Sequence, residues 1–297
     1  MSPTNELDTY IKKHLGHLFP QGMDTCTLYH YTTVDTLEVL TRKDADFICT
    51  YCAAMNDSAE FSIGIKLIKD YMGRHPGTLD EEMGAALATF SSNPSFASWS
   101  MSFSRDGDSL NQWISYTDRT EGGVAIGFDL HDLNQRVHDL KNKCGLMYVV
   151  PCLYVGEHDK EIEDLLDFLF GEYRASLCST IDRKSRIKTS SSEKWISLTI
   201  ALIFASMVKD GSFRGEQEWR LVMLPCDEDV VRDCEFIAGK PRLRTRLFGV
   251  DYELAQSIVD VVCSPHGHMQ PKVDMIATLR KLSQKPHVSK STYKANG

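Results

Sequence analysis

The order of the predicted elements constrains the fold of this chain most, because strand-like segments stand at both ends and a long helical stretch lies between them. Alternating apolar side chains predict strands at residues 27–31, 47–51, 98–104, 123–129, 146–154, 218–224, 242–247 and 258–263. Helical spacing predicts helices at 6–18, 34–41, 58–73, 80–89 and 111–117, and over 160–208 apart from a basic, Ser-rich loop at 183–192. This arrangement favours an α+β fold over a repeating βαβ array.

The chain is interpreted as one domain, residues 1–297, with a helical insertion at about 157–212. Its 297 residues would allow two domains, but no spacer rich in Pro, Gly or Ser separates two self-contained patterns. With 42% hydrophobic and 25% charged residues, the composition is that of a globular protein large enough to bury a full core.

Charge, apolar runs and cysteines together predict a cytoplasmic protein that uses no membrane. The net charge of -8 argues against a general coat for nucleic acids, although a local basic groove is compatible with it. The first twenty residues hold no apolar run suited to a signal peptide. The longest apolar stretch, Trp195–Val208, is shorter than the roughly 20 residues of a membrane span, so we expect a buried core helix there. Nine scattered cysteines fit reduced thiols better than a disulfide framework.

A zinc site is the one metal-binding hypothesis that the cysteines allow. Cys49 and Cys52 form an isolated C-x-x-C pair, and Cys263 with His266 is the plausible completion of four ligands. The spacing is unlike that of a standard finger, so buried small hydrophobic residues are favoured over ligands. We therefore expect no metal, and a zinc-stabilised interaction domain remains the alternative.

Several familiar catalytic and nucleotide-binding motifs are missing from the sequence. It contains no G-x-G-x-x-G after a strand, no G-x-x-x-x-G-K-[ST], no H-E-x-x-H and no G-x-S-x-G. The Gly-rich segment 122–127 runs directly into alternating apolar positions, which predicts a turn that enters a strand rather than a nucleotide loop.

A series of short segments carries the functional signal. In chain order they are LYHYTT at 28–33, MNDSAE at 55–60, WSMSFS at 99–104, WISY at 113–116, GVAIGFD at 123–129 and EQEWR at 216–220. This ordered set resembles the DUF2971 family, which is similar to ADP-ribosyltransferases. The resemblance covers residues from about 28 to 224, and each segment alone would be a weak signal.

The resemblance implies an ADP-ribosyltransferase-like split β-sandwich with helical insertions, which holds NAD in a cleft. One kind of ADP-ribosyltransferase uses a His on a strand, a later aromatic and a Glu that begins a late strand, and a second kind uses an S-x-S strand and an E-x-E turn. His30, Tyr116 and Glu218 match these as catalytic residues, although Tyr31 stands where a Gly is usual. The implied NAD-binding residues are His30, Tyr31, Thr32, Ser102, Ser104, Trp113, Tyr116 and Glu216.

The expected chemistry assigns a role to each catalytic candidate. Cleavage of the nicotinamide glycosidic bond passes through a state that resembles an oxocarbenium ion, which the carboxylate of Glu218 would stabilise. His30 would fix a ribose hydroxyl, and the ring of Tyr116 would stack on nicotinamide. The expected function is an NAD-dependent ADP-ribosyltransferase, such as a toxin or antiviral-defence effector. It would modify a protein or nucleic-acid acceptor and hydrolyse NAD as a side reaction.

Each candidate also has a purely structural interpretation. His30 lies between two tyrosines and can be a satisfied polar group of the core. Glu216 and Glu218 have the same strand parity and can both face solvent, with Arg220 in a surface ion pair worth at most about 1 kcal/mol. Trp113 and Tyr116, three residues apart, are by spacing alone more often core residues. The alternative function is a nucleotide- or partner-binding module that has lost catalysis.

A basic strand face completes the candidate site. Arg242, Arg244 and Arg246 alternate with apolar residues, so a strand would place them on one face. Three guanidinium groups there can hold the NAD pyrophosphate, with Arg244 as the expected contact, or the phosphates of a nucleic acid. A solvated face is the alternative.

Overall fold

The chain has the mixed α+β fold that the order of its elements predicts. The computed structural model describes residues 3–18, 26–43, 45–52, 58–75, 98–117, 121–139, 146–176, 190–224, 235–237, 240–245, 254–266, 270–279 and 287–293. The number of domains and the bounds of the insertion at 157–212 remain predictions. Within the described residues, no helix is both long and apolar enough to cross a membrane.

A 10-stranded sheet joins strands from nearly the whole described chain. Its main order is β12-β11-β4-β1-β3-β2-β10-β9, and β8 joins β5 to β3. The strands of this sheet are β1 (Thr27–Thr32), β2 (Ile48–Tyr51), β3 (Trp99–Ser104), β4 (Val124–Asp129), β5 (Leu146–Pro151), β8 (Glu218–Leu224), β9 (Glu235–Ile237), β10 (Lys240–Arg244), β11 (Ile258–Cys263) and β12 (His287–Lys290). A separate pair is formed by β6 (Leu153–Tyr154) and β7 (Val208–Lys209).

Strand β3 is where the sheet divides, because it pairs with three other strands. Strand β8 pairs with it antiparallel along its full length, from Trp99 opposite Met223 to Ser104 opposite Glu218. Of the other two, β1 meets it only at Ser104, and β2 meets it only at Trp99 and Ser100. Strands β1 and β2 therefore diverge between these two points, and the middle of β3 is left without a strand partner on that side.

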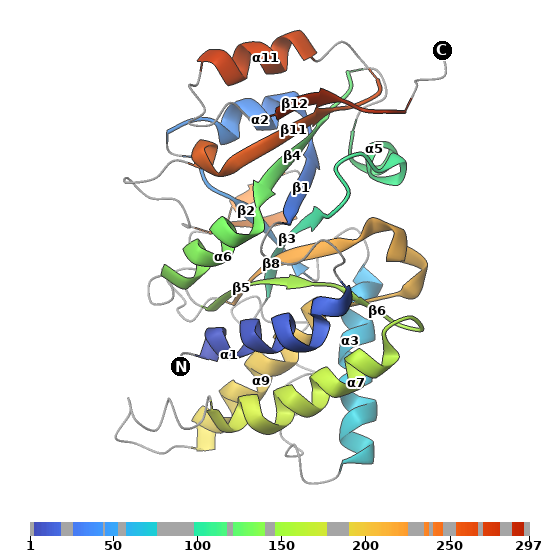
Figure 1. Ribbon diagram of the computed structural model, residues 1–297. Helices are drawn as coiled ribbons and strands as arrows, with labels where there is room; N and C mark the ends of the chain where they lie inside the picture. The colour runs from blue at the N-terminus through green and yellow to red at the C-terminus, as the bar shows by residue number, and fades with distance from the viewer. Residues whose placement is uncertain are drawn as a thin grey trace.

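Helices cover the two ends of this sheet (Figure 1). In that view α1, α3, α7 and α9 form a layer below β5 and β8, and α2 lies near α11 at the opposite end, where these two helices are also in contact. The helical elements are α1 (Pro3–Tyr10), η1 (Ile11–Leu15), η2 (Gly16–Leu18), α2 (Val34–Leu40), α3 (Ser58–Arg74), α5 (Leu110–Tyr116), α6 (Leu130–Asp139), α7 (Asp159–Phe168), η5 (Leu169–Tyr173), α9 (Ser190–Met207), η6 (Gly211–Glu216), η7 (Leu254–Ser257) and α11 (Gln270–Leu279).

Helix α9 is the buried core helix that the long apolar stretch predicts. Ile200, Ile203 and Phe204 on it are fully buried in the main core. Burying each such side chain contributes roughly 1.5–3 kcal/mol. Helix α3 approaches closely at Gly64, where an added Cβ would lie 2.5 Å from the Cα of Ala205. This contact brings α3 and α9 together within the helical layer.

Most predicted elements are confirmed, and the differences have local causes. Gly122 has a φ of 77° and precedes β4, so the predicted turn into a strand is confirmed. The predicted loop at 183–192 is wrong for Ser190–Ser192, which begin α9, and the predicted helix at 80–89 lies outside the described residues. The opening helix changes to a π-helix and then a 3₁₀ helix after Tyr10. The sequence interpretation missed the helical elements α6, η6, η7 and α11 and the strands β7, β9 and β12.

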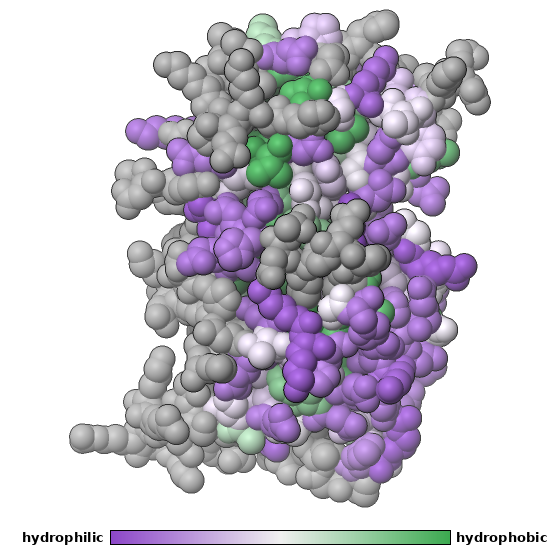
Figure 2. Space-filling model, in the orientation of Figure 1, coloured by the Kyte–Doolittle hydropathy of each residue, from purple (hydrophilic) through white to green (hydrophobic). Residues whose placement is uncertain are grey.

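The surface drawn in Figure 2 is largely hydrophilic. Hydrophilic side chains gather over the helical layer at the lower right, and apolar ones reach the surface as small separate patches among the coloured residues (Figure 2).

Candidate functional site

A pocket of about 520 Å³ lies at the divergence of β1 and β2 from β3. Its size is that of a small-molecule site. Of the predicted site residues, seven line it: His30, Tyr31, Ser102, Ser104, Tyr116, Glu216 and Glu218. Lining residues that sequence reasoning did not select include Thr50, Ser100, Gln112, Lys209, Phe213 and Lys240. A larger cavity of about 690 Å³ lies between α1 and α7 and contains none of the predicted site residues.

His30 fills part of the opening in the sheet. Its Nδ1 lies 3.0 Å from the carbonyl oxygen of Ser102, and since a carbonyl only accepts, Nδ1 donates. Burial lowers the pKa of His30, the bond to Ser102 opposes this, and the charge of Arg242 lowers the pKa further. The imidazole is therefore neutral at pH 7, and its Nε2 is a hydrogen-bond acceptor. The interpretation of His30 as only a satisfied core group accounts for the bond at Nδ1 but gives no role to Nε2.

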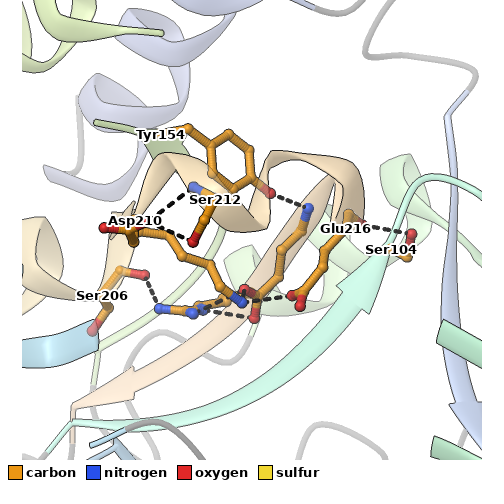
Figure 3. Close-up of polar contacts among 9 residues, drawn as sticks. Ser104, Tyr154, Ser206, Asp210, Ser212 and Glu216 are labelled. Atoms are coloured by element: carbon orange, nitrogen blue, oxygen red, sulfur yellow. Dashed lines mark hydrogen bonds and ion pairs between the residues drawn. The ribbon is translucent and has the colours of Figure 1, made fainter. Parts of the chain in front are cut away.

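Glu218 begins β8 and is held by two cations, Arg220 on the same strand and Lys209 on β7. Arg220 binds it through both oxygens, with Nε 2.8 Å from Oε1 and Nη2 2.9 Å from Oε2. Lys209 Nζ lies 2.8 Å from Oε2 of Glu218 and 2.6 Å from Oε2 of Glu216. We call Lys209, Glu216, Glu218 and Arg220 the carboxylate cluster. In Figure 3 the polar contacts run from Ser206 at the left to Glu216 at the right.

The carboxylate cluster is buried, so its electrostatics differ from those of a surface ion pair. Glu218 is only 5% exposed. Burial alone would raise its pKa, but the charge and hydrogen bonds of Arg220, followed by those of Lys209, lower that pKa to about 2. The alternative in which Glu218 and Arg220 form a solvent-facing pair is therefore wrong, and Glu218 is ionised at any physiological pH.

Glu216 lies outside the strand that Glu218 begins. The interpretation that gave both residues the same strand parity is therefore wrong. Glu216 ends the 3₁₀ helix η6, and Gln217 then adopts the left-handed region with a φ of 46°. The backbone oxygen of Glu216 accepts a hydrogen bond of 2.8 Å from the Ser104 hydroxyl. The turn thus ties the carboxylate cluster to the end of β3, where Ser104 stands opposite Glu218.

The aromatic candidates fall into two groups. Trp113 is 1% exposed, packs edge-on against Tyr31 and donates from Nε1 to Asp108, so it belongs to the core. The hydroxyl of Tyr31 donates to the backbone of Asp106, which ties this pocket residue into the same core cluster. Tyr116 is 44% exposed and lines the pocket. Trp113 and Thr32 are not among the described residues that line the pocket.

The basic strand face is only partly at the pocket. Arg242 lines it, whereas Arg244 is exposed and stands outside the lining formed by the described residues. Arg246 lies outside the described part of the chain. Lys240 joins Arg242 in the lining, as the period of two in a strand requires. Of the described arginines on this strand, Arg242 is therefore the one that lines the pocket, and a phosphate contact stays a prediction.

The zinc hypothesis finds no geometric support. Cys49 is on β2 and Cys263 is on β11, and the sheet places β4, β1 and β3 between these strands. Within the described residues, no group of three or more His, Cys, Asp or Glu side chains is arranged to hold a metal ion. Burial raises the pKa values of Cys49 and Cys52, as expected for inert core thiols.

Comparison with known proteins identifies a family. Residues 112–221 match the model of a family described as "Protein of unknown function (DUF2971)". This segment runs from α5 to β8 and includes Tyr116, Lys209, Glu216 and Glu218 of the pocket. No curated protein and no solved structure gives a significant match to the chain.

Proposed function

Since the chain belongs to the DUF2971 family, whose description assigns no activity, we propose a function from the pocket itself: it binds NAD and cleaves the nicotinamide glycosidic bond. The products are nicotinamide and ADP-ribose joined to an acceptor, which is a protein or a nucleic acid, with NAD hydrolysis as the side reaction. In this proposal the divergence of β1 and β2 from β3 corresponds to the opening of an ADP-ribosyltransferase-like split β-sandwich.

One observation carries the proposal. His30, Tyr116 and Glu218 lie on β1, α5 and β8, far apart in the sequence, and all three line one pocket. Ser102 and Ser104 of the S-x-S strand lie between them on β3. The residues selected for one reaction are thus within reach of one small molecule, which is the first requirement for joint catalysis.

Each side chain has a chemical role that its contacts allow. The neutral His30 accepts a hydrogen bond from a ribose hydroxyl at Nε2, because Nδ1 is already committed to Ser102. Tyr116 offers an exposed ring on which nicotinamide can stack. Glu218 is a fixed negative charge, and such a charge stabilises an oxocarbenium-like state more than the ground state.

The contacts of Glu218 also set a condition on the mechanism. Arg220 and Lys209 cancel much of its field, and a ribose hydroxyl that binds Oε2 competes with Lys209 for that oxygen. Lys209 also bonds Glu216, which can retain it when the contact to Glu218 lengthens. The proposal therefore requires Glu216 to hold Lys209 while Glu218 faces the ribose.

The decisive experiment measures free nicotinamide after incubation with NAD. Glu218→Gln should lower the rate by a factor on the order of 10² or more, because it removes the charge that the transition state needs. The substitution also disturbs the buried ion pairs, so circular dichroism must show that the variant is folded at the assay temperature. Glu163→Gln, at an exposed pair with Arg74, is the matched control and should retain the rate. An undiminished rate in folded Glu218→Gln would remove Glu218 from the mechanism.

A second candidate is a nucleotide-binding module without catalysis. It is favoured by the cationic partners of both Glu218 oxygens, which suit an architectural ion cluster as well as a reacting carboxylate. This candidate predicts that the wild-type protein binds NAD, seen by calorimetry, while no nicotinamide appears.

A further inference from the structure

A row of polar side chains crosses three strands at the end of the pocket remote from Glu218. Arg242 on β10 stands directly opposite Thr50 on β2, and Thr50 stands directly opposite Ser100 on β3. Residues in direct register point to the same face of a sheet, with Cβ atoms about 4.5–5.5 Å apart. All three line the pocket, and the Arg242 guanidinium donates to the Thr50 hydroxyl. The row is therefore one continuous polar surface.

The Ser100 hydroxyl is the anomaly in this row. Ser100 is 1% exposed, and its Oγ has no hydrogen-bond partner in the described part of the chain. A buried hydroxyl without a partner costs about 1–3 kcal/mol, so such groups are rare and call for a reason. An acceptor on a bound ligand at this end of the pocket would supply the missing bond.

The charge at this end selects the ligand. Arg242 is half-buried, and burial lowers the pKa of its guanidinium. Within the described residues it forms no ion pair with a carboxylate, in contrast to Arg220. A half-buried guanidinium without a carboxylate partner favours a ligand anion, and its planar set of donors suits phosphate oxygens.

We propose that Ser100, Thr50 and Arg242 form a phosphate subsite, and that the pocket therefore takes a nucleotide rather than a nucleoside. The subsite and Glu218 lie at opposite ends of β3, since Ser100 and Ser104 are about 13 Å apart along a strand. For the identity of the nucleotide as NAD the inference rests on the proposed function, with the phosphate at Arg242, the ribose at His30 and the scissile bond near Glu218.

Calorimetry with inorganic pyrophosphate and with ADP-ribose tests the subsite without any cleavage. Arg242→Gln should raise the dissociation constant of ADP-ribose about tenfold or more, because a charge-assisted hydrogen bond is lost. Arg244→Gln is the matched control, since Arg244 is two residues away on the same strand but exposed, and it should leave the constant unchanged within about twofold. Ser100→Ala should raise the constant about three- to tenfold.

The outcomes separate the subsite from the proposed function. ADP-ribose that binds wild type but not Arg242→Gln supports the subsite even if NAD is never cleaved. Pyrophosphate that binds as tightly as ADP-ribose would show a site for free anions and overturn the nucleotide assignment. Equal affinities in wild type, Arg242→Gln and Ser100→Ala, or binding of neither probe, would overturn the subsite itself.

Discussion

The two ends of the pocket solve the problem of buried charge in opposite ways. At the carboxylate cluster, two cations and two anions bind one another, and the Ser104 hydroxyl nearby has both a donor and an acceptor partner. At the Arg242 end, the described residues leave a guanidinium without a carboxylate and the Ser100 hydroxyl without any partner. The first end is complete within the chain, and the second requires something from outside it.

The two ends therefore have different roles: one stabilises the fold, and the other recognises the ligand. A network that satisfies itself gains rigidity from its own bonds and keeps its geometry without ligand. An unsatisfied buried group raises the free energy of the empty site, and a ligand that satisfies it recovers that energy on binding. We therefore expect the carboxylate cluster to dominate stability and the Arg242 end to dominate ligand affinity.

The largest expected effect is on unfolding. Arg220→Met should lower the free energy of unfolding by about 3–5 kcal/mol, because it leaves the buried Glu218 without its main partner. Arg242→Met should change it by about 1 kcal/mol or less, since Thr50 is the one residue of the described chain to which Arg242 donates. Urea unfolding at pH 7.5 measures both, with Arg74→Met at an exposed pair as the baseline. Equal losses for Arg220→Met and Arg242→Met would contradict the distinction between the ends.

The difference in stability between wild type and Glu218→Gln at acidic pH reports the carboxylate cluster. The pKa of Glu218 is lowered from 4.5 to about 2 in the folded chain, which corresponds to a stabilisation on the order of 3 kcal/mol. This contribution is full above pH 4.5 and is lost as the pH falls toward about 2, because the unfolded chain takes up the proton first. Unfolding free energies of wild type and Glu218→Gln, measured from pH 7 to pH 3, should therefore converge on acidification. A constant difference would mean that the ion pairs do not hold Glu218 ionised.

Much of the fold was predictable from the sequence, because a long element shows its pattern of apolar residues more clearly than a short one. Strands β3, β4, β8 and β11 are six or seven residues long, and their predicted bounds hold to within one residue. Strands β9 and β12 have only three and four residues, which is too few for a period of two to be visible. Ser190–Ser192 have weak helical propensity and suggested a loop, but they form the first turn of α9.

The sequence predicted the part of the candidate site that depends on residue type. It did not predict the part that depends on which strands are neighbours in the sheet. His30, Tyr116 and Glu218 were selected by an ordered resemblance and do line one pocket. Spacing could not decide that Trp113 turns into the core while Tyr116 faces out. The partnership of Ser100 with Thr50 and Arg242 follows from the order β3-β2-β10, in which the last two strands are far apart in sequence.

Two serines on β3 provide the next test of the difference between the two ends of the pocket. Ser104 and Ser100 share a face of β3, but the Ser104 hydroxyl donates to Glu216 and accepts from the backbone of Asp106. Ser104→Ala should therefore cost about 1–2 kcal/mol of unfolding free energy, while Ser100→Ala should be neutral or slightly stabilising, because it removes an unsatisfied group. Thermal unfolding of the two variants checks this. A comparable loss in Ser100→Ala would show that its hydroxyl is satisfied after all.

The smallest expected effect concerns His30, whose ring shares one feature with each end of the pocket. Its Nδ1 is bound within the chain to Ser102, and its Nε2 is left to accept from a ligand. His30→Ala should weaken NAD binding about two- to tenfold, the usual value of one hydrogen bond. Because burial lowers the pKa of His30 below 6.5, the wild-type affinity should persist at pH 6.5 and fall only at lower pH, whereas His30→Ala should lack this dependence. Calorimetry of NAD binding at pH 7.5, 6.5 and 5.5 follows both effects. If the pH dependence survives in His30→Ala, another group titrates in the site, and His30 serves only to close the gap between β1 and β3.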